Sequence, residues 1–257
     1  MQAHERITAA IKAATKSGRP ALIPFLTAGY PEPGDFVETL KAVAAVGDVV
    51  EIGIPFSDPM ADGMTIQRSS FEALRKGVSL EWILGQLDSV CEEIDTPLVM
   101  MSYLNPLLAY GYDRLAERAY NAGVCGFIVP DLPFEESEDI RNALEVRDLG
   151  LVQLVTPATP DARLKTLCAE SRGFVYAVTI TGITGGGDAL PDDLSDYLDN
   201  VRAMSPLPVC AGFGIRTAKD VAAIGSHADG AIVGSALVEV LERGDDPQPF
   251  LKSLIGT

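Results

Sequence analysis

One stretch of the chain places a carboxylate where a buried strand is expected: Val49-Val50-Glu51-Ile52-Gly53-Ile54-Pro55-Phe56-Ser57-Asp58-Pro59-Met60-Ala61-Asp62-Gly63. The stretch begins as an apolar run and ends as a loop rich in proline and glycine. An unpaired carboxylate inside a strand core is strongly destabilising, so one is rarely found there without a function. Asp58 before Pro59 fits an ordinary turn. Glu51 fits neither a turn nor a helix cap, which predicts a functional residue at this position.

Seven further apolar runs lie on either side of this stretch. They are apolar throughout rather than alternating, as expected for parallel strands that are covered by helices on both faces. The eight runs begin at Ala21, Asp48, Pro97, Gly126, Leu151, Phe174, Pro208 and Gly230. Amphipathic helix patterns separate them, at 35–46, 80–94, 113–122, 135–147, 161–170, 192–203 and 217–225. Thr217 with Asp220 three residues later predicts a capping box at the start of the last of these helices.

Eight strand–helix units without a linker predict an α/β fold, a single (β/α)8 TIM barrel that forms one domain over residues 1–257. An additional helix is expected at the N-terminus, because Ile7, Ala10, Ile11 and Ala14 form one helical stripe. A doubly wound sheet is the alternative. It usually has fewer strands, and the G-x-G-x-x-G motif of its dinucleotide-binding members is absent from this sequence.

The composition narrows the class of protein. A net charge of −16 argues against nucleic acids and anionic membrane surfaces as partners, since both require basic patches. The four cysteines lie far apart without a C-x-x-C pair, which predicts reduced thiols rather than disulfides or a zinc site. The first residues lack the apolar core of a signal peptide, and no stretch is long and apolar enough to span a membrane. We therefore expect a soluble, cytoplasmic protein.

Loop lengths and glycines indicate where a ligand is expected. The intervals from residue 48 to 97 and from 174 to 208 are longer than those between the other strand starts, and barrel active sites lie on the loops that follow the strands. The last three strands run into glycines, in Gly185-Gly186-Gly187, Ala211-Gly212-Phe213-Gly214 and Val233-Gly234-Ser235-Ala236. Backbone N–H groups at such glycines, together with a helix starting after Gly234-Ser235, favour a phosphorylated substrate.

Several chemistries are excluded by the residues that are absent. The sequence has two histidines and no G-x-S-x-G motif, which argues against a Ser-His-Asp triad. All seven lysines fall in predicted helices or their flanks, so a Schiff-base lysine in the barrel mouth is not expected. Asp58 and Asp62 alone make a poor Mg²⁺ site, and no metal is predicted.

Acid–base chemistry by carboxylates remains. Burial in the barrel mouth should raise the pKa of Glu51, which suits a proton donor and acceptor near neutral pH. Asp62, on a more polar loop, is expected to stay ionised, so that the two carboxylates divide the task. Aromatic and aliphatic residues near the strand ends predict a pocket for a flat apolar group: Phe25, Met101, Tyr103, Tyr176 and Phe213.

These segments resemble the tryptophan synthase α-subunit family. The resemblance rests on the stretch from Glu51 to Pro59 with Ala61-Asp62-Gly63 and Thr65-Ile66-Gln67, and it extends in order over nearly the whole chain. The other matching segments are Pro24-Phe25-Leu26-Thr27-Ala28-Gly29, Tyr103-Leu104-Asn105-Pro106, Pro130-Asp131-Leu132-Pro133, Gly182-Ile183-Thr184-Gly185, Gly212-Phe213-Gly214-Ile215 and Val233-Gly234-Ser235-Ala236.

The resemblance implies a carbon–carbon lyase, which cleaves indole-3-glycerol phosphate reversibly to indole and glyceraldehyde 3-phosphate. It implies that Glu51 is the acid/base for indole C3 and the glycerol hydroxyl, and that Asp62 accepts the indole N–H hydrogen bond. The implied phosphate-binding residues are Gly185, Gly214, Gly234 and Ser235. The implied indole pocket consists of Phe25, Ile66, Met101, Tyr176 and Phe213, with Thr184 helping to position Asp62.

The resemblance also implies a partner, because the family forms αββα complexes that pass indole to a β-subunit carrying pyridoxal phosphate. No cofactor is implied for this chain itself. Residues that match positions near the β-subunit are Pro55, Asp58, Asn105, Asp131 and Pro133. The sequence departs from the family at Met64, which replaces a usual proline, at Ile180, where a polar or basic residue is common, and in the glycine-rich Gly185-Gly186-Gly187-Asp188. These departures concern loop closure and coupling to the partner.

Three alternatives stay open at this point. The chain could be a stand-alone lyase that releases free indole, a regulatory subunit without activity, or an unrelated barrel isomerase acting on a sugar phosphate. Retention of Glu51, Asp62 and the glycine loops argues against the regulatory subunit.

Overall fold

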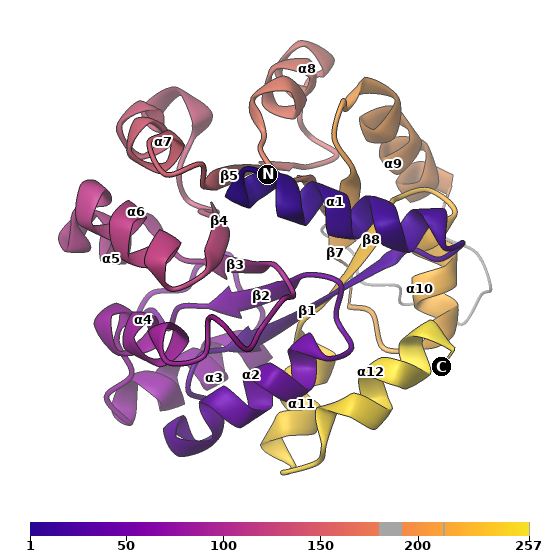
Figure 1. The fold of residues 1–257 in the computed structure, drawn as a ribbon. Coiled ribbons are helices and arrows are strands. Elements are labelled where there is room, and N and C mark those ends of the chain that lie inside the picture. Colours follow the sequence, from indigo (N-terminus) through magenta and orange to yellow (C-terminus); the bar gives the residue numbers. More distant parts are fainter. Residues whose placement is uncertain (180–191, 213, 257) are drawn as a thin grey trace.

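The barrel predicted from the sequence is confirmed in the computed structural model of the chain, which describes residues 1–179, 192–212 and 214–256. Within these ranges, eight parallel strands pair in sequence order, and β8 closes the barrel by pairing with β1 (Figure 1). The strands are β1 (Ala21–Thr27), β2 (Val50–Gly53), β3 (Leu98–Met101), β4 (Val124–Ile128), β5 (Gly150–Val155), β6 (Val175–Val178), β7 (Val209–Gly212) and β8 (Gly230–Val233).

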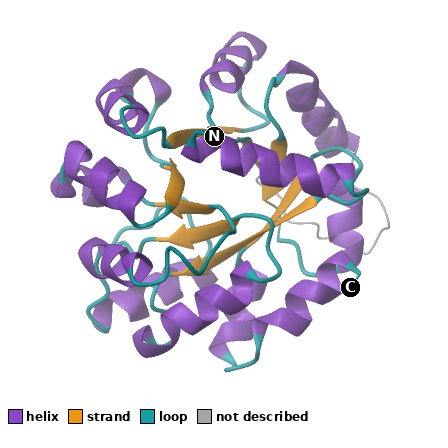
Figure 2. Cartoon of the chain, in the orientation of Figure 1, coloured by secondary structure: helices purple, strands orange, loops and turns teal. Residues whose placement is uncertain are grey.

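Helices surround the barrel on its outside (Figure 2). They are α2 (Phe36–Ala44), α3 (Met64–Arg75), α4 (Leu80–Asp88), α5 (Leu104–Tyr110), α6 (Tyr112–Asn121), α7 (Glu138–Glu145), α8 (Asp161–Glu170), α9 (Asp192–Met204), α10 (Ala218–Gly225), α11 (Ser235–Glu242) and α12 (Pro247–Ile255). Two short 3₁₀ helices, η1 (Pro33–Asp35) and η2 (Phe134–Glu136), precede α2 and α7. The capping box at Thr217 is confirmed, because the hydroxyl accepts from the Asp220 N–H and the Asp220 carboxylate accepts from the Thr217 N–H.

The predicted N-terminal helix, α1 (Ala3–Lys16), lies across one end of the barrel (Figure 1). Ile7 and Ile11 are fully buried and pack with inward-facing barrel residues that include Ile23, Val99 and Phe174. This end is therefore sealed by apolar contacts, which leaves the opposite end, where the strands finish, available for a site.

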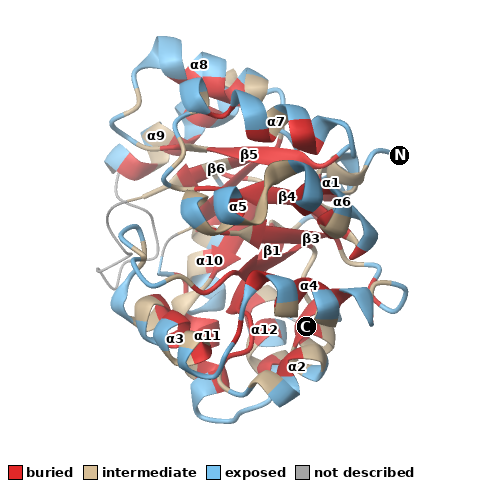
Figure 3. Cartoon of the chain, turned by 90° about the vertical axis from the view of Figure 1, so that its left-hand side faces the viewer, coloured by how far each residue is buried: buried red, intermediate tan, exposed pale blue. Residues whose placement is uncertain are grey.

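A second apolar layer fills the space between the strands and the surrounding helices. Figure 3 shows strands that are mostly buried and helices that are exposed on their outer sides. Among the described residues, no helix combines the length and apolar character that a membrane crossing requires.

Helix α3 is not among the helices predicted from the sequence, and its buried face explains why. That face includes Ser69 and Ser70 where an amphipathic pattern would have large apolar residues. Ser69 is satisfied inside the protein, since its hydroxyl lies 2.6 Å from the Thr27 hydroxyl of β1 and donates to the Ile66 carbonyl at 2.9 Å.

Candidate active site

Glu51 is part of the barrel wall and lines the open end of the barrel. It lies in β2, in register with Phe25 of β1 and Val99 of β3, and it is 2% exposed. Its Oε2 atom has no hydrogen-bond partner among the described residues. Burial, together with a smaller contribution from the nearby Asp62 carboxylate, raises the pKa of Glu51 to about 8. The shift has the direction expected from the sequence, and it leaves Glu51 largely protonated at neutral pH.

Asp62 lies on the loop between β2 and α3. Tyr103 Oη donates to Asp62 Oδ2 at 3.1 Å, and Gln67 Nε2 donates to the Asp62 carbonyl at 2.8 Å. Burial raises the pKa of Asp62 to about 6, although the hydrogen bond from Tyr103 lowers it. The loop is therefore less polar around this side chain than the sequence suggests, but Asp62 still remains mostly ionised at pH 7.

The two carboxylates line one cavity of about 250 Å³ at the open end of the barrel, here called the mouth cavity. Four of the residues predicted for the apolar pocket also line it: Phe25, Ile66, Met101 and Tyr176. Thr184, Gly185, Phe213 and Ile180 lie outside the described residues. The chain thus brings two acidic groups with different pKa values against a largely apolar wall, which is an arrangement suited to acid–base chemistry on a flat substrate.

Two glycines make room for the aromatic walls of the mouth cavity. A Cβ atom on Gly53 would lie 2.4 Å from Phe25 Cζ, and one on Gly212 would lie 2.6 Å from Tyr176 Oη. Any larger residue would force either ring to move. These two glycines therefore shape the cavity, because their lack of a side chain leaves room for the rings of Phe25 and Tyr176.

One side of the mouth cavity is suited to an anion. Gly214, Gly234 and Ser235 line it, as the sequence predicts, and α11 begins at Ser235. The first N–H groups of a helix have no partner within it and carry partial positive charge. Arg216 also lines the cavity, and its guanidinium donates to both Glu239 oxygens at 2.7 and 2.8 Å. Sequence reasoning missed Arg216, although its position two residues after Gly214, in the loop that follows β7, is a usable signal.

The residues predicted to contact a partner separate into two groups. Asp58, Asn105, Asp131 and Pro133 are exposed on loops and a helix that follow β2, β3 and β4, and we call these four residues the partner face. Pro55 is buried, so it packs against its own chain instead of lying on that face.

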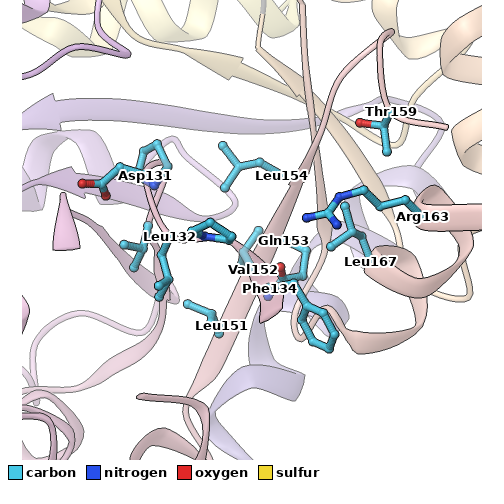
Figure 4. Close-up of a pocket in the computed structure, with 13 residues that line it drawn as sticks. Asp131, Leu132, Phe134, Leu151, Val152, Gln153, Leu154, Thr159, Arg163 and Leu167 are labelled. Carbon is cyan, nitrogen blue, oxygen red and sulfur yellow. The ribbon is translucent and has the colours of Figure 1, made fainter. Parts of the chain in front are cut away.

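A second cavity of about 300 Å³, here called the outer cavity, shares no lining residue with the mouth cavity. Figure 4 shows it between the loop after β4, strand β5 and helix α8. Its apolar lining residues include Leu132, Phe134, Leu151 and Leu167, and Gln153 of β5 is 6% exposed beside them. Neither Glu51 nor Asp62 lines the outer cavity. In the described ranges, no three His, Cys, Asp or Glu side chains gather in a way that could hold a metal ion.

The fold and the mouth cavity together place the chain among (β/α)8-barrel enzymes, with two carboxylates in the cavity at the end where the strands finish. Comparison with known proteins identifies the family within that class. The model of the family described as "Tryptophan synthase alpha chain" matches residues 11–254, and the chain belongs to this family.

Relatives and solved structures agree with this assignment. The tryptophan synthase alpha chain of Nitratidesulfovibrio vulgaris is 42% identical over 249 residues, covering 96% of this chain and 97% of that protein. The alpha chain of Bacillus cereus is 45% identical, covering 91% of each. The structure of Mycobacterium tuberculosis tryptophan synthase superposes with a TM-score of 0.89 at 35% identity, covering 98% of this chain and 97% of the other. The tryptophan synthase subunit alpha of Legionella pneumophila gives a TM-score of 0.87 at 33% identity, covering 99% and 97%.

Proposed function

We propose that the chain cleaves indole-3-glycerol phosphate reversibly to indole and glyceraldehyde 3-phosphate, as a lyase of tryptophan biosynthesis. The observation that carries this proposal is the meeting of Glu51, Asp62 and the start of α11 in one cavity. Membership of the tryptophan synthase alpha chain family supports it.

Protonated Glu51 starts the reaction by donating its proton to indole C3. The ring nitrogen then carries developing positive charge, and ionised Asp62 stabilises it by accepting the N–H hydrogen bond. The Glu51 carboxylate next removes the proton of the glycerol hydroxyl, the C3–C3′ bond breaks, and its electrons return to the indole ring. Indole and the aldehyde are released, and Glu51 is protonated again, so one residue serves as acid and then as base.

The remaining lining residues position the substrate in this proposal. Phe25, Ile66, Met101 and Tyr176 border the indole ring. Gly214, Gly234 and Ser235 bind the phosphate through backbone N–H groups and the serine hydroxyl. The roles of Gly185, Thr184 and Phe213 stay predictions. No step requires a cofactor, and we propose that residues 1–257 act as one domain.

We further propose that the chain works in an αββα complex and passes indole to a β-subunit that carries pyridoxal phosphate. The exposure of Asp58, Asn105, Asp131 and Pro133 on one set of neighbouring loops supports a docking face. The cytoplasmic location expected from composition stays a prediction. No observation favours a stand-alone lyase.

An indole-release assay tests the reaction and the partner together. The purified chain should release indole from indole-3-glycerol phosphate, and addition of a cognate β-subunit should raise the rate and give a co-eluting complex. Release without enhancement or co-elution would support the stand-alone lyase instead. Absence of release, with and without the β-subunit, would contradict the lyase proposal.

A further inference from the structure

Tyr103 connects the loop that carries Asp62 with the partner face. It lies two residues after the end of β3 and directly before α5, and its side chain is almost fully buried. Its ring stacks on Phe56 of the loop after β2, with centroids 5.1 Å apart and an interplanar angle of 26°. The ring is therefore fixed between the second and third strand ends, independently of its hydroxyl group.

The hydroxyl of Tyr103 holds the loop that carries Asp62. It accepts from the Ala61 N–H at 2.8 Å and donates to Asp62 Oδ2 at 3.1 Å. The neighbouring Met60 is 84% exposed, and Gly63 is also exposed, so packing on either side of Asp62 contributes little to its placement. The other contacts that restrain this part of the loop hold its backbone rather than the Asp62 carboxylate: the Asp62 N–H donates to the Pro59 carbonyl at 3.1 Å, and Gln67 Nε2 donates to the Asp62 carbonyl.

The backbone next to Tyr103 is tied to the partner face. The Leu104 N–H donates to Asp131 Oδ1 at 2.9 Å, which fixes the start of α5 against the loop after β4. Asn105 is the next residue of the same helix and is exposed. A partner that contacts Asp131 and Asn105 would therefore act on the backbone that positions the Tyr103 ring.

We propose that Tyr103 is a positioning residue, which orients the Asp62 carboxylate and couples it to the partner face through the start of α5. The inference rests on the proposed function. Tyr103 acts through Asp62, because it is Asp62 that meets the indole nitrogen.

The charged and titratable groups around Asp62 show how the Tyr103 hydroxyl affects the ionisation of this carboxylate. Glu51 from β2 and Tyr176 from β6 interact electrostatically with Asp62, and Arg216 lies in the same cavity after β7. Glu51 is mostly protonated at neutral pH, and Arg216 is paired with Glu239. The Tyr103 hydroxyl therefore supplies the direct hydrogen bond that favours ionised Asp62 among the described side chains. Its removal should make Asp62 harder to ionise.

Tyr103→Phe tests the inference, because it keeps the stacked ring and removes both hydrogen bonds. We expect kcat for indole release to fall about tenfold, with a smaller change in KM, since a misplaced Asp62 affects developing charge more than ground-state binding. The acidic limb of the pH profile of kcat/KM should move up by about one pH unit, the size expected for loss of a hydrogen bond to a carboxylate. Rate enhancement by the β-subunit should shrink.

Tyr110→Phe is the matched control. Tyr110 lies on the same helix, and its hydroxyl donates to Glu81 Oε2 at 2.6 Å, away from the mouth cavity. This variant also loses one phenolic hydrogen bond of α5 but should keep the parent pH profile and enhancement. An identical change in both variants would show a general effect on α5 and would overturn the inference.

A pair of variants at Asp131 tests the coupling without a partner present. In the isolated chain, Asp131→Ala removes the acceptor for the Leu104 N–H, whereas Asp131→Asn retains an acceptor oxygen. We expect only the alanine variant to lower kcat and to shift the acidic limb. Equal behaviour of the two variants would overturn the coupling and leave only the positioning role.

Carbon-13 NMR of labelled aspartate separates this inference from the proposed function. The apparent pKa of Asp62 can be followed in the free protein, without turnover, and should be higher in Tyr103→Phe than in the parent. A protein with no lyase activity but with this shift would contradict the proposed function alone. An unchanged titration of Asp62 would overturn the positioning role whatever the activity.

Discussion

The mouth cavity and the outer cavity have similar volumes, about 250 and 300 Å³, but they bury different polar groups. Glu51 lies in the first and Gln153 in the second, both on strands and both less than a tenth exposed. Among the described residues, Glu51 Oε2 is a buried oxygen without a hydrogen-bond partner, whereas the side-chain amide of Gln153 is not a buried group that lacks one. A buried polar group in a cavity is therefore not enough to locate an active site in this barrel.

The two cavities differ in the residues that surround Glu51 and Gln153. Asp62 adds a second carboxylate to the mouth cavity and contributes to the raised pKa of Glu51. The start of α11 adds N–H groups suited to a phosphate. In the outer cavity, Arg163 is instead bound by Glu135, and the Thr159 hydroxyl accepts from the Thr156 N–H, so both are engaged in local structure. A coupled pair of carboxylates, rather than burial alone, distinguishes the mouth cavity as the candidate for catalysis.

The strongest test of this comparison is Glu51→Gln. Glutamine keeps the shape of the side chain but cannot transfer a proton, so we expect the rate of indole release to fall by about 10³-fold or more. Circular dichroism and binding of a non-cleavable substrate analogue should show an intact fold and cavity. Near-normal turnover by this variant would contradict the assignment of the mouth cavity as the catalytic one.

The pH dependence of activity provides the next test, because it reports both carboxylates. Asp62 must be ionised to support the cation, so activity should fall below about pH 6. Glu51 must be protonated to act as the acid, so kcat/KM should also fall above about pH 8. The expected profile is a bell with a roughly tenfold loss per pH unit beyond each limb. Asp62→Asn should remove the acidic limb, and persistence of that limb would assign it to another group.

Burial of Glu51 should also be visible in stability, without any substrate. Its pKa rises from 4.5 to about 8 on folding, so its contribution to stability is fully present below about pH 4.5 and is lost as the pH rises through 8. Glu51→Gln removes the ionisable group and therefore the loss of stability that the parent shows as the pH rises. Relative to the parent, the variant should gain about 2–4 kcal/mol in free energy of unfolding between pH 5 and pH 9.

Urea unfolding at several pH values measures this difference. Glu38→Gln is a suitable control, because the Glu38 side chain is 81% exposed on α2, and it should show no comparable pH dependence relative to the parent. If the difference between Glu51→Gln and the parent did not change with pH, the raised pKa of Glu51 would be wrong.

Much of this arrangement can be predicted from the sequence, because strands covered on both faces are apolar throughout and a carboxylate among them is conspicuous. Glu51, the eight strands and the glycines before α11 follow from that reasoning. Other features depend on contacts between distant segments. The raised pKa of Asp62 arises where its loop packs into the barrel mouth, and helix α3 buries Ser69 against Thr27 of another element. Arg216 has the character of an ordinary surface residue, and its place shortly after the glycines that follow β7 is the one signal in the sequence that points to the cavity.

The smallest expected effect belongs to Gln153→Leu. Leucine is close to glutamine in size, and Leu151 and Leu167 already line the outer cavity. The Gln153 backbone N–H would keep its hydrogen bond to Ser171 Oγ at 2.9 Å. Because leucine would bury additional apolar surface against these neighbours, we expect the variant to gain about 1 kcal/mol in free energy of unfolding, with kcat and KM unchanged.

Gln153→Glu is the informative companion, since it places an ionisable group in the outer cavity, which neither Glu51 nor Asp62 lines. The carboxylate that does line this cavity, Asp131, already accepts from the Leu104 N–H. This variant should lose stability as the pH rises above about 4.3, the ordinary pKa of glutamate, because the buried carboxyl group must then either stay ionised or take up a proton on folding. It should keep the activity of the parent. Thermal unfolding and indole release measured across pH would check both expectations. Loss of activity in Gln153→Leu with an unchanged melting temperature would mean that the outer cavity contributes to catalysis, and the distinction between the two cavities would then fail.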